Sequence, residues 1–459
     1  MRELRESRVS HCLAYHRGGV IDFLSSTAKK WLSRIDPAIV FLLALALTLR
    51  WRFNVEEHRP GDFIFSDMWV YDHRAGHLYD RPAYAWDTFT PLGYPAFLAF
   101  LFRIFGRDYA VIGAVQAIIG AAISPLTYVV ARLATGSRVV AFLSGLALAL
   151  YLPLIFYGGL LLTEVPFTAL VLLTTIAVFA SGRAAAKPIR RSVWPAAIAG
   201  VIFSMAVLVR PNLLVGFPAI AIYLWVAFRR NTRRTMIVLA TLLATAAPLM
   251  IWASVHNSRI LGRNAGLATN GGLNFFLAHE ELRGASYDEP IPEGTKHHEI
   301  VPIPNSARFT AMYQSPVPLY DEKFFYRKSL RRIGRDPSKL WRSIDNVLVG
   351  FGRGPIEYWP YWEKRDETLK TFSRNALWVL ILPAAIYAFG LTVFRRFGRR
   401  TESGRLLVTL LGFSVVPVLY LFLGDPRMRV PYDPFFVILA TDLVVRSGSA
   451  FVRLIRRCR

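Results

Sequence analysis

A series of long apolar runs constrains the fold of this chain more than any other feature. About ten runs are long enough to cross a lipid bilayer as helices, given that about 20 residues are needed. They lie at roughly 36–53, 109–131, 139–161, 165–181, 193–209, 212–228, 235–253, 376–394, 406–423 and 432–446. Because backbone polar groups must be paired inside hydrocarbon, such runs form helices. The sequence therefore predicts an α-helical polytopic membrane protein with about ten transmembrane helices.

The composition agrees with this prediction. The chain is 54% hydrophobic and 14% aromatic, and its mean hydropathy is +0.35. A soluble domain of this composition would leave apolar surface exposed to water. The two cysteines, Cys12 and Cys458, lie near opposite ends of the chain. They exclude a disulfide framework and a metal site built from thiolates.

The net charge of +24 is distributed in a way that indicates membrane topology. With about ten spans, both termini lie on one side, and the loops on that side carry about 27 Lys and Arg but only about 4 acids. These segments are 1–35, 132–138, 183–191, 229–234, 395–405 and 446–459. We therefore expect an integral inner (plasma) membrane protein with both termini cytoplasmic, in contact with membrane lipids and without a nucleic-acid partner.

The alternation of apolar runs with polar loops divides the chain into five predicted parts. They are a basic, interfacial N-terminal segment (1–35), a transmembrane module with an outer loop at 54–108 (36–253), an extracytoplasmic domain (254–375), the C-terminal transmembrane helices (376–446) and a basic cytoplasmic tail (447–459). In the outer loop, Ser66 is a suitable N-cap for a helix from Asp67, and "AFLAFLFRIF" is typical of an interfacial helix. We expect an amphipathic-helix cap on the membrane.

Asp67 is the candidate catalytic residue. A helix that starts there places Tyr71 on the same face, and nearby aromatic residues can partly desolvate the carboxylate, which makes it a better base. An acid at the membrane surface can act as a general base on an acceptor hydroxyl. The alternative is an ordinary solvated acid at a helix start. Tyr71, Asp72 and Tyr94 are candidate substrate contacts from the same loop.

Glu164 and Arg210 lie in short outer turns between apolar runs. Ionisable residues beside membrane segments are costly and often functional. Glu164 could line a pocket or orient a partner, or it could cap the following helix. Arg210 could bind a lipid phosphate, or it could extend to the headgroups. We include both residues as candidate substrate contacts.

Arg427 and Arg429, in "GDPRMRVPYDP", carry the strongest signal. They lie in a short outer loop, on the side that short loops normally keep free of cations. Prolines at 426 and 431 stiffen the loop, which predicts a fork of two guanidinium groups suited to phosphate oxygens. The alternative is contact with lipid headgroups.

An ordered set of short stretches resembles the membrane glycosyltransferases of the GT-C superfamily. The most similar group is the family 39-like one related to protein O-mannosyltransferases and aminoarabinose lipid A transferases. The stretches are "SDMWVYDHRAGHLYD", "TPLGYPAFLAFLFRIFG", "YGGLLLTEVPFTALVLL", "AVLVRPNLL", "ATNGGLNFFLAH" and "GDPRMRVPYDPFFVILA". They extend over most of the chain from about 36 to 446.

The resemblance implies a GT-C-like fold and a sugar donor linked to a polyprenyl phosphate, used on the extracytoplasmic face. It also implies that the acid of the first outer loop, here Asp67, is the catalytic base. Many members carry a second acid directly beside the first, whereas Met68 follows Asp67 here. Asn270, in the turn "TNGG", is a further candidate contact, although "NFFLAH" departs from the commoner Gly-Asn-Asn ending.

We therefore expect a glycosyltransferase that moves a sugar from a polyprenyl-phosphate donor to a hydroxyl of a glycolipid, polysaccharide or protein acceptor. A lipid-linked oligosaccharide ligase is the closest alternative. A lipid or sugar transporter (flippase) would be expected to show inverted repeats and charges near the bilayer midplane. No cofactor is predicted, and the sequence does not indicate a divalent metal.

Overall fold

The protein is almost entirely helical in the part of the chain that the structure describes. The computed structural model describes residues 36–64, 66–279, 298–300, 313–315, 317–353, 371, 375–393, 400–422 and 424–458, so the predicted segment 1–35 lies outside it. Two short strands, β1 (His298–Ile300) and β2 (Tyr313–Ser315), pair in antiparallel fashion. The remaining elements are helices, as predicted for a polytopic membrane protein.

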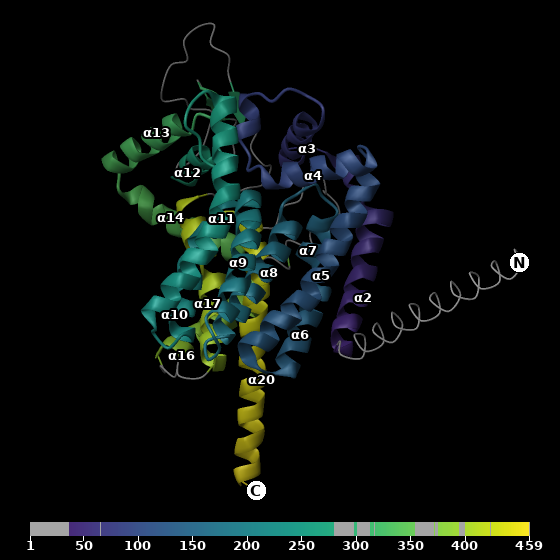
Figure 1. Cartoon of the computed structure of the whole chain (residues 1–459), viewed down its shortest axis with the longest axis vertical. Coiled ribbons are helices and arrows are strands. Elements are labelled where there is room, and N and C mark those ends of the chain that lie inside the picture. The colour runs from purple at the N-terminus through teal and green to yellow at the C-terminus, as the bar shows by residue number, and fades with distance from the viewer. Residues whose placement is uncertain are drawn as a thin grey trace, which may run out of the picture.

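The apolar runs form a bundle of helices (Figure 1). Its α-helices are α2 (Pro37–Trp51), α5 (Tyr109–Thr135), α6 (Arg138–Ala149), α7 (Leu152–Gly158), α8 (Glu164–Arg183), α9 (Arg190–Val209), α10 (Phe217–Ala227), α11 (Thr232–Leu261), α16 (Leu382–Val393), α17 (Arg400–Phe413), α18 (Val415–Leu421) and α20 (Asp433–Cys458). Short 3₁₀ and π segments flank them at η1 (Arg52–Glu57), η2 (Pro60–Phe63), η4 (Pro211–Gly216), η6 (Leu377–Ile381) and η7 (Val430–Tyr432).

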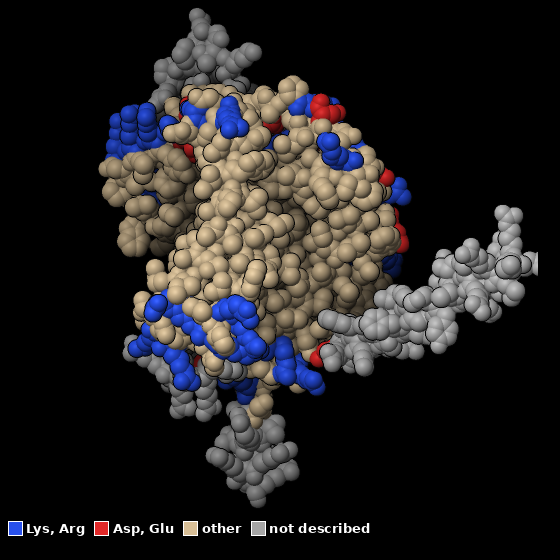
Figure 2. All heavy atoms as spheres, viewed as in Figure 1, with Lys and Arg blue, Asp and Glu red and all other residues tan. Residues whose placement is uncertain are grey.

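Among the described residues, six helices are long and apolar enough to cross a membrane, or seven if α6 and α7, bent by 47°, count as one span. The protein is thus a polytopic membrane protein, and the total of about ten spans stays a prediction. Figure 2 shows Lys and Arg gathered densely at the lower end of the bundle, while the middle of the visible face is almost entirely free of charge. An uncharged band between charged ends is typical of a membrane-spanning bundle.

A second group of helices lies at the other end of the bundle (Figure 1). These are α3 (Ser66–Tyr79), η3 (Ala85–Thr88), α4 (Gly93–Phe105), α12 (Gly271–His279), α13 (Glu322–Arg335), α14 (Ser338–Leu348), η5 (Val349–Arg353) and α19 (Pro426–Arg429). Helices α3 and α4 form where the outer loop was expected to form them. Asp336 lies between α13 and α14, and its carboxylate accepts a hydrogen bond from the Ser338 backbone N–H at 3.1 Å.

Helix α11 joins the bundle to this end. Its 30 residues extend about 45 Å, more than the thickness of the hydrocarbon core. Near its end, Asn257 Oδ1 accepts a hydrogen bond from Arg74 Nη2 of α3 at 3.1 Å. Asn257 Nδ2 in turn donates to the carbonyls of Gly266 and Leu267, both at 3.0 Å. These contacts hold the two long outer segments together above the bundle.

A buried arginine stabilises the break between α6 and α7. The last carbonyls of a helix lack intrahelical partners, which is costly inside a membrane. Arg50 of α2 donates to the carbonyls of Leu148 and Ala149 at 2.9 and 3.0 Å. Gly120 of α5 leaves room for this arginine, since a Cβ there would lie 3.0 Å from Arg50 Cδ. One cation thus replaces the missing helical donors.

We predict that Arg50→Met lowers the unfolding temperature of the detergent-solubilised protein. The Ala149 carbonyl loses its arginine donor, at about 1–3 kcal/mol, while the Leu148 carbonyl keeps the long 3.5 Å contact from the Tyr151 N–H. Arg52→Met is the matched control, since Arg52 is exposed and pairs only with Glu57, at 3.0 Å. Such a surface pair contributes at most about 1 kcal/mol. Equal unfolding temperatures for the two variants, measured by differential scanning fluorimetry, would contradict this role of Arg50.

Candidate functional site

Four charged residues from four elements meet at the end of the bundle where α3 lies. Arg427 Nη1, in α19, donates to Asp67 Oδ2, in α3, at 2.6 Å, although the two residues are 360 positions apart. Arg427 Nε donates to Glu164 Oε1 at the start of α8. Arg210 Nη2 donates to the same Glu164 oxygen at 2.6 Å. We call Asp67, Glu164, Arg210 and Arg427 the charge cluster.

Glu164 is the most deeply buried member of the charge cluster, with 0% of its side chain exposed. It begins α8, where the helix dipole favours a carboxylate. The preceding Thr163 Oγ1 accepts a hydrogen bond from Arg210 Nε at 2.7 Å, which orients that guanidinium. The second carboxylate oxygen, Glu164 Oε2, is buried and has no hydrogen-bond partner within the described residues. It can therefore accept a hydrogen bond from a ligand.

Arg427 is held from two sides but keeps one nitrogen available. Asp425 caps the short helix α19 by accepting a hydrogen bond from the Arg427 backbone N–H at 2.8 Å. Burial disfavours the charged guanidinium, but the carboxylates of Glu164 and Asp67 outweigh it and raise the pKa of Arg427 well above its usual value. In the described part of the chain, Arg427 Nη2 makes no hydrogen bond. This nitrogen can donate to an anion.

Asp67 is the accessible member of the charge cluster. Its side chain is 49% exposed, against 19% for that of Arg427. One helical turn further on, Tyr71 is buried, and its ring meets the ring of Tyr94 edge-on at 5.2 Å. Burial and then the Asp67 carboxylate raise the pKa of Tyr71 to about 12, so its hydroxyl is a neutral donor at physiological pH. Asp67 and Tyr71 share a face as predicted.

Arg429 points away from the charge cluster, which corrects the expected fork of two arginines. Its side chain is completely buried, and Nε donates to Asp433 Oδ1 at 2.9 Å. Tyr151 also donates to the Asp433 carboxylate. The predicted loop is in fact the short helix α19, in which residues two apart point in nearly opposite directions. Arg427 alone faces Asp67.

Asp72 and Tyr94 have partners of their own. Asp72 accepts hydrogen bonds from Arg107 and, at 3.0 Å, from the Tyr109 hydroxyl. The Tyr94 hydroxyl donates to Gln116 Oε1 at 2.7 Å. Neither residue is hydrogen-bonded to the charge cluster among the described residues. Both contacts join the outer loop to α5 and position α3, so their predicted contact with substrate remains a prediction.

Asn270 also lies outside the hydrogen bonds of the charge cluster that the structure describes. Its backbone carbonyl accepts a hydrogen bond from Asn274 N–H at 3.0 Å, in the first turn of α12. The adjacent Thr269 N–H donates to the Thr88 carbonyl at 2.9 Å. The predicted turn is therefore the place where the second outer segment is fixed to the first.

The sequence analysis missed three polar residues that support these positions. Gln116 interrupts an apolar run and binds Tyr94, while its Nε2 donates to the carbonyls of Gly158 and Leu160, each at 2.8 Å. Asp433 and Tyr151 are the partners of Arg429. The available signal was a polar residue inside or beside a predicted membrane span, which is costly without a partner.

Part of the chain matches a known protein family. Residues 90–252 match the family model described as dolichyl-phosphate-mannose-protein mannosyltransferase. The matched stretch contains Glu164 and Arg210, while Asp67 and Arg427 lie outside it. The predicted resemblance to protein O-mannosyltransferases is therefore confirmed for residues 90–252, about a third of the chain. No curated protein sequence matches the chain.

Solved structures of two related proteins are similar to this one. One is an oligosaccharyltransferase AglB from Archaeoglobus fulgidus, in complex with an inhibitory peptide and a dolichol-phosphate. Its TM-score is 0.49 and its sequence identity is 12%, and the match covers 92% of this chain and 52% of the AglB chain. The other is ArnT from Cupriavidus metallidurans, bound to undecaprenyl phosphate. Its TM-score is 0.39 and its sequence identity is 15%, and the match covers 89% of this chain and 77% of the ArnT chain. The chain thus spans about half the length of AglB.

We predict that Arg429 contributes to stability rather than to chemistry. Arg429→Met leaves the buried Asp433 carboxylate without its partner, which costs about 3–5 kcal/mol. The double variant Arg429→Met/Asp433→Leu is expected to regain part of this loss. Arg427→Met is the control and is expected to lower the unfolding temperature less, because Glu164 keeps its ion pair with Arg210 and Asp67 is half exposed to solvent. A greater loss for the double variant than for Arg429→Met would contradict this assignment.

Proposed function

We propose that this chain is a membrane glycosyltransferase that moves a sugar from a polyprenyl-phosphate donor to an acceptor hydroxyl, with Asp67 as general base and Arg427 as the cation that binds the leaving phosphate. The observation that carries the proposal is the 2.6 Å contact between Arg427 Nη1 and Asp67 Oδ2. In such a donor, a single oxygen joins the anomeric carbon to the phosphate. The base on the attacking hydroxyl and the cation on the leaving phosphate must therefore both lie within reach of one anomeric carbon.

The reaction needs one base and one site for developing negative charge. The acceptor oxygen attacks the anomeric carbon while Asp67 accepts the hydroxyl proton. The bond between the anomeric carbon and the phosphate oxygen breaks, and the polyprenyl phosphate leaves with the electron pair. Negative charge thus builds up on the phosphate in the transition state. A guanidinium placed there stabilises the transition state more than the bound substrate.

The resting contacts suggest how the donor engages the charge cluster. Arg427 Nη2 makes no hydrogen bond among the described residues, so it can meet a phosphate oxygen first. When Arg427 Nη1 also donates to the phosphate, its hydrogen bond to Asp67 breaks. The Asp67 carboxylate then becomes available to the acceptor hydroxyl. Glu164 keeps hold of Arg427 Nε throughout, so the guanidinium stays in place. In this proposal Glu164 is a positioning residue.

Arg210 and Tyr71 complete the proposed site. Arg210 shares the Glu164 oxygen with Arg427 and lies over the ring of Phe167 at 5.8 Å, so it supplies a second cation near the phosphate. Tyr71 supplies a neutral hydroxyl one turn from Asp67. Together the two arginines balance Asp67 and Glu164, and the incoming phosphate adds negative charge to a neutral cluster. The same groups would serve a lipid-linked oligosaccharide ligase.

Two further observations support a transferase over a transporter. The family matched by residues 90–252 is named for a mannosyltransferase that uses a lipid-phosphate sugar. The charge cluster also lies at one end of α8, whereas a transporter site is expected near the middle of the membrane. We propose that transfer occurs on the extracytoplasmic face, with a glycolipid, polysaccharide or protein as acceptor.

We predict that Asp67→Asn abolishes transfer but retains binding of the donor lipid, because the amide cannot accept the proton. The assay is mass analysis of envelope glycolipids and glycoproteins from cells that lack the protein and carry each variant. Asp62→Asn is the matched control, an exposed acid that precedes α3, and is expected to restore the missing product. Binding of undecaprenyl phosphate to purified Asp67→Asn is measured in parallel. If the Asp67→Asn variant fully restored the missing product, Asp67 could not be the catalytic base.

We predict that Arg427→Ala lowers the rate of transfer about a hundredfold, as expected for one preorganised charge interaction of about 3 kcal/mol. The rate is measured per amount of membrane-inserted protein. Arg103→Ala is the control, since Arg103 is exposed in the last turn of α4 and forms no ion pair among the described residues, and its rate is expected to stay within about threefold of wild type. Equal rates for the two variants would remove Arg427 from the mechanism.

A further inference from the structure

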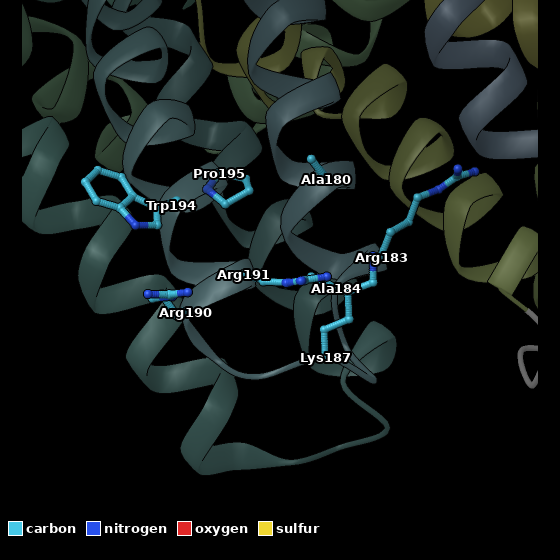
Figure 3. Close-up of a pocket in the computed structure, with 8 residues that line it drawn as sticks. All are labelled: Ala180, Arg183, Ala184, Lys187, Arg190, Arg191, Trp194 and Pro195. Atoms are coloured by element: carbon cyan, nitrogen blue, oxygen red, sulfur yellow. The ribbon is translucent and has the colours of Figure 1, made fainter.

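A second site lies between the end of α8 and the start of α9. A pocket of about 530 Å³ opens there. Figure 3 shows the Arg191 side chain extending from α9 toward Ala184 of α8. The lining includes four cations and two residues of the first turns of α9, namely Arg183, Lys187, Arg190, Arg191, Trp194 and Pro195. We call it the basic pocket.

The basic pocket is separate from the charge cluster. Glu164 of the cluster begins the 20-residue helix α8, and Arg183 of the pocket ends it. At 1.5 Å per residue these positions are about 30 Å apart, the thickness of the hydrocarbon core. The two sites therefore lie at opposite ends of the bundle.

The walls of the basic pocket are held in place by hydrogen bonds. Arg234 of α11 donates to the carbonyls of Ala184, Ala185 and Lys187 at 2.9, 2.6 and 2.9 Å. Ser181 Oγ donates to the Ser192 carbonyl at 2.7 Å and joins α8 to α9. The loop between the two helices is thus fixed by the rest of the fold, and the shape of the pocket exists before any ligand binds.

Three cations of the basic pocket form no ion pair in the part of the chain that the structure describes. Lys187, Arg190 and Arg191 are exposed, and no carboxylate among the described residues forms an ion pair with them. Like charges gathered in one pocket repel each other, so an anion that binds there is favoured. The forked guanidinium groups of Arg190 and Arg191 match the oxygens of a phosphate. The pocket is thus suited to a phosphate group.

An apolar stripe leads away from the basic pocket along α9. Trp194 is 67% exposed, and an exposed indole is typical of the level where headgroups meet hydrocarbon. Exposed apolar side chains follow it at spacings of four, three and four residues, at Ile198, Val201 and Met205. This spacing places them on one face of the helix. A ligand with a phosphate head and an acyl chain fits both features.

We propose that the basic pocket binds the phosphate of an anionic phospholipid, with an acyl chain lying along the stripe from Trp194 to Met205. The shared chemistry of the ligand is a phosphate group, which a soluble phosphate could also supply. The stripe selects the lipid, because a soluble phosphate gains nothing from apolar side chains exposed on a membrane-spanning helix. Bound lipid would join α8 to α9 at the end opposite the charge cluster.

The test compares two pairs of arginines at the same end of the bundle. Wild type, Arg190→Gln/Arg191→Gln and the control Arg229→Gln/Arg233→Gln are each placed in phosphatidylcholine nanodiscs with increasing phosphatidylglycerol. Both doubles remove two exposed positive charges, but Arg229 and Arg233 do not line the pocket. Lipid kept by the released protein is counted by native mass spectrometry. The pocket double is expected to retain phosphatidylglycerol about thirtyfold more weakly than the control double.

Two outcomes would overturn the proposal. Equal retention by the two double variants would mean that the basic surface as a whole attracts the lipid. Displacement of phosphatidylglycerol from wild type by millimolar inorganic phosphate would assign the pocket to a soluble anion. The single variant Lys187→Gln provides the same test should the pocket double fail to fold. It is expected to weaken retention about fivefold, and unchanged retention would count against the site.

Discussion

The contacts of Arg427 are the interaction on which the end of the bundle that carries α3 depends. One guanidinium joins α19 to α3 through Asp67 and to α8 through Glu164. Glu164 is completely buried, and a buried carboxylate without cations would be strongly destabilising. The helices that carry Arg210 and Arg427 must therefore pack where their guanidinium groups reach it. The electrostatic requirement of one acid positions four separate segments around the proposed site.

Other buried arginines follow the same rule, but they serve the fold. Arg50 supplies hydrogen bonds to a broken helix, and Arg74 joins α3 to α11 through Asn257. Arg429 is paired with Asp433 and completely buried. Arg427 differs because its partner Asp67 is half exposed, so a ligand can reach the ion pair. The exposure of its partner distinguishes a guanidinium that can meet a ligand.

The two ends of α8 have opposite electrostatic designs. At its start, two arginines balance two carboxylates, and the groups are held within hydrogen-bond distance of each other. At its end, the lining of the basic pocket holds four cations and no acid. A balanced cluster suits chemistry, because its charges can be redistributed during a reaction. An unbalanced pocket attracts an anion and suits binding.

The sequence by itself determined the helices, the cap helices and the candidates Asp67, Glu164, Arg210 and Arg427, because apolar periodicity and the cost of charges beside a membrane are local properties. It could not determine that Arg429 faces Asp433, since the direction of that side chain depends on α19 being a helix. It also could not determine the partners of Asp72 and Tyr94, or the contact between Asp67 and Arg427. Those contacts join residues far apart in the chain, and only the packing of the helices brings such residues together.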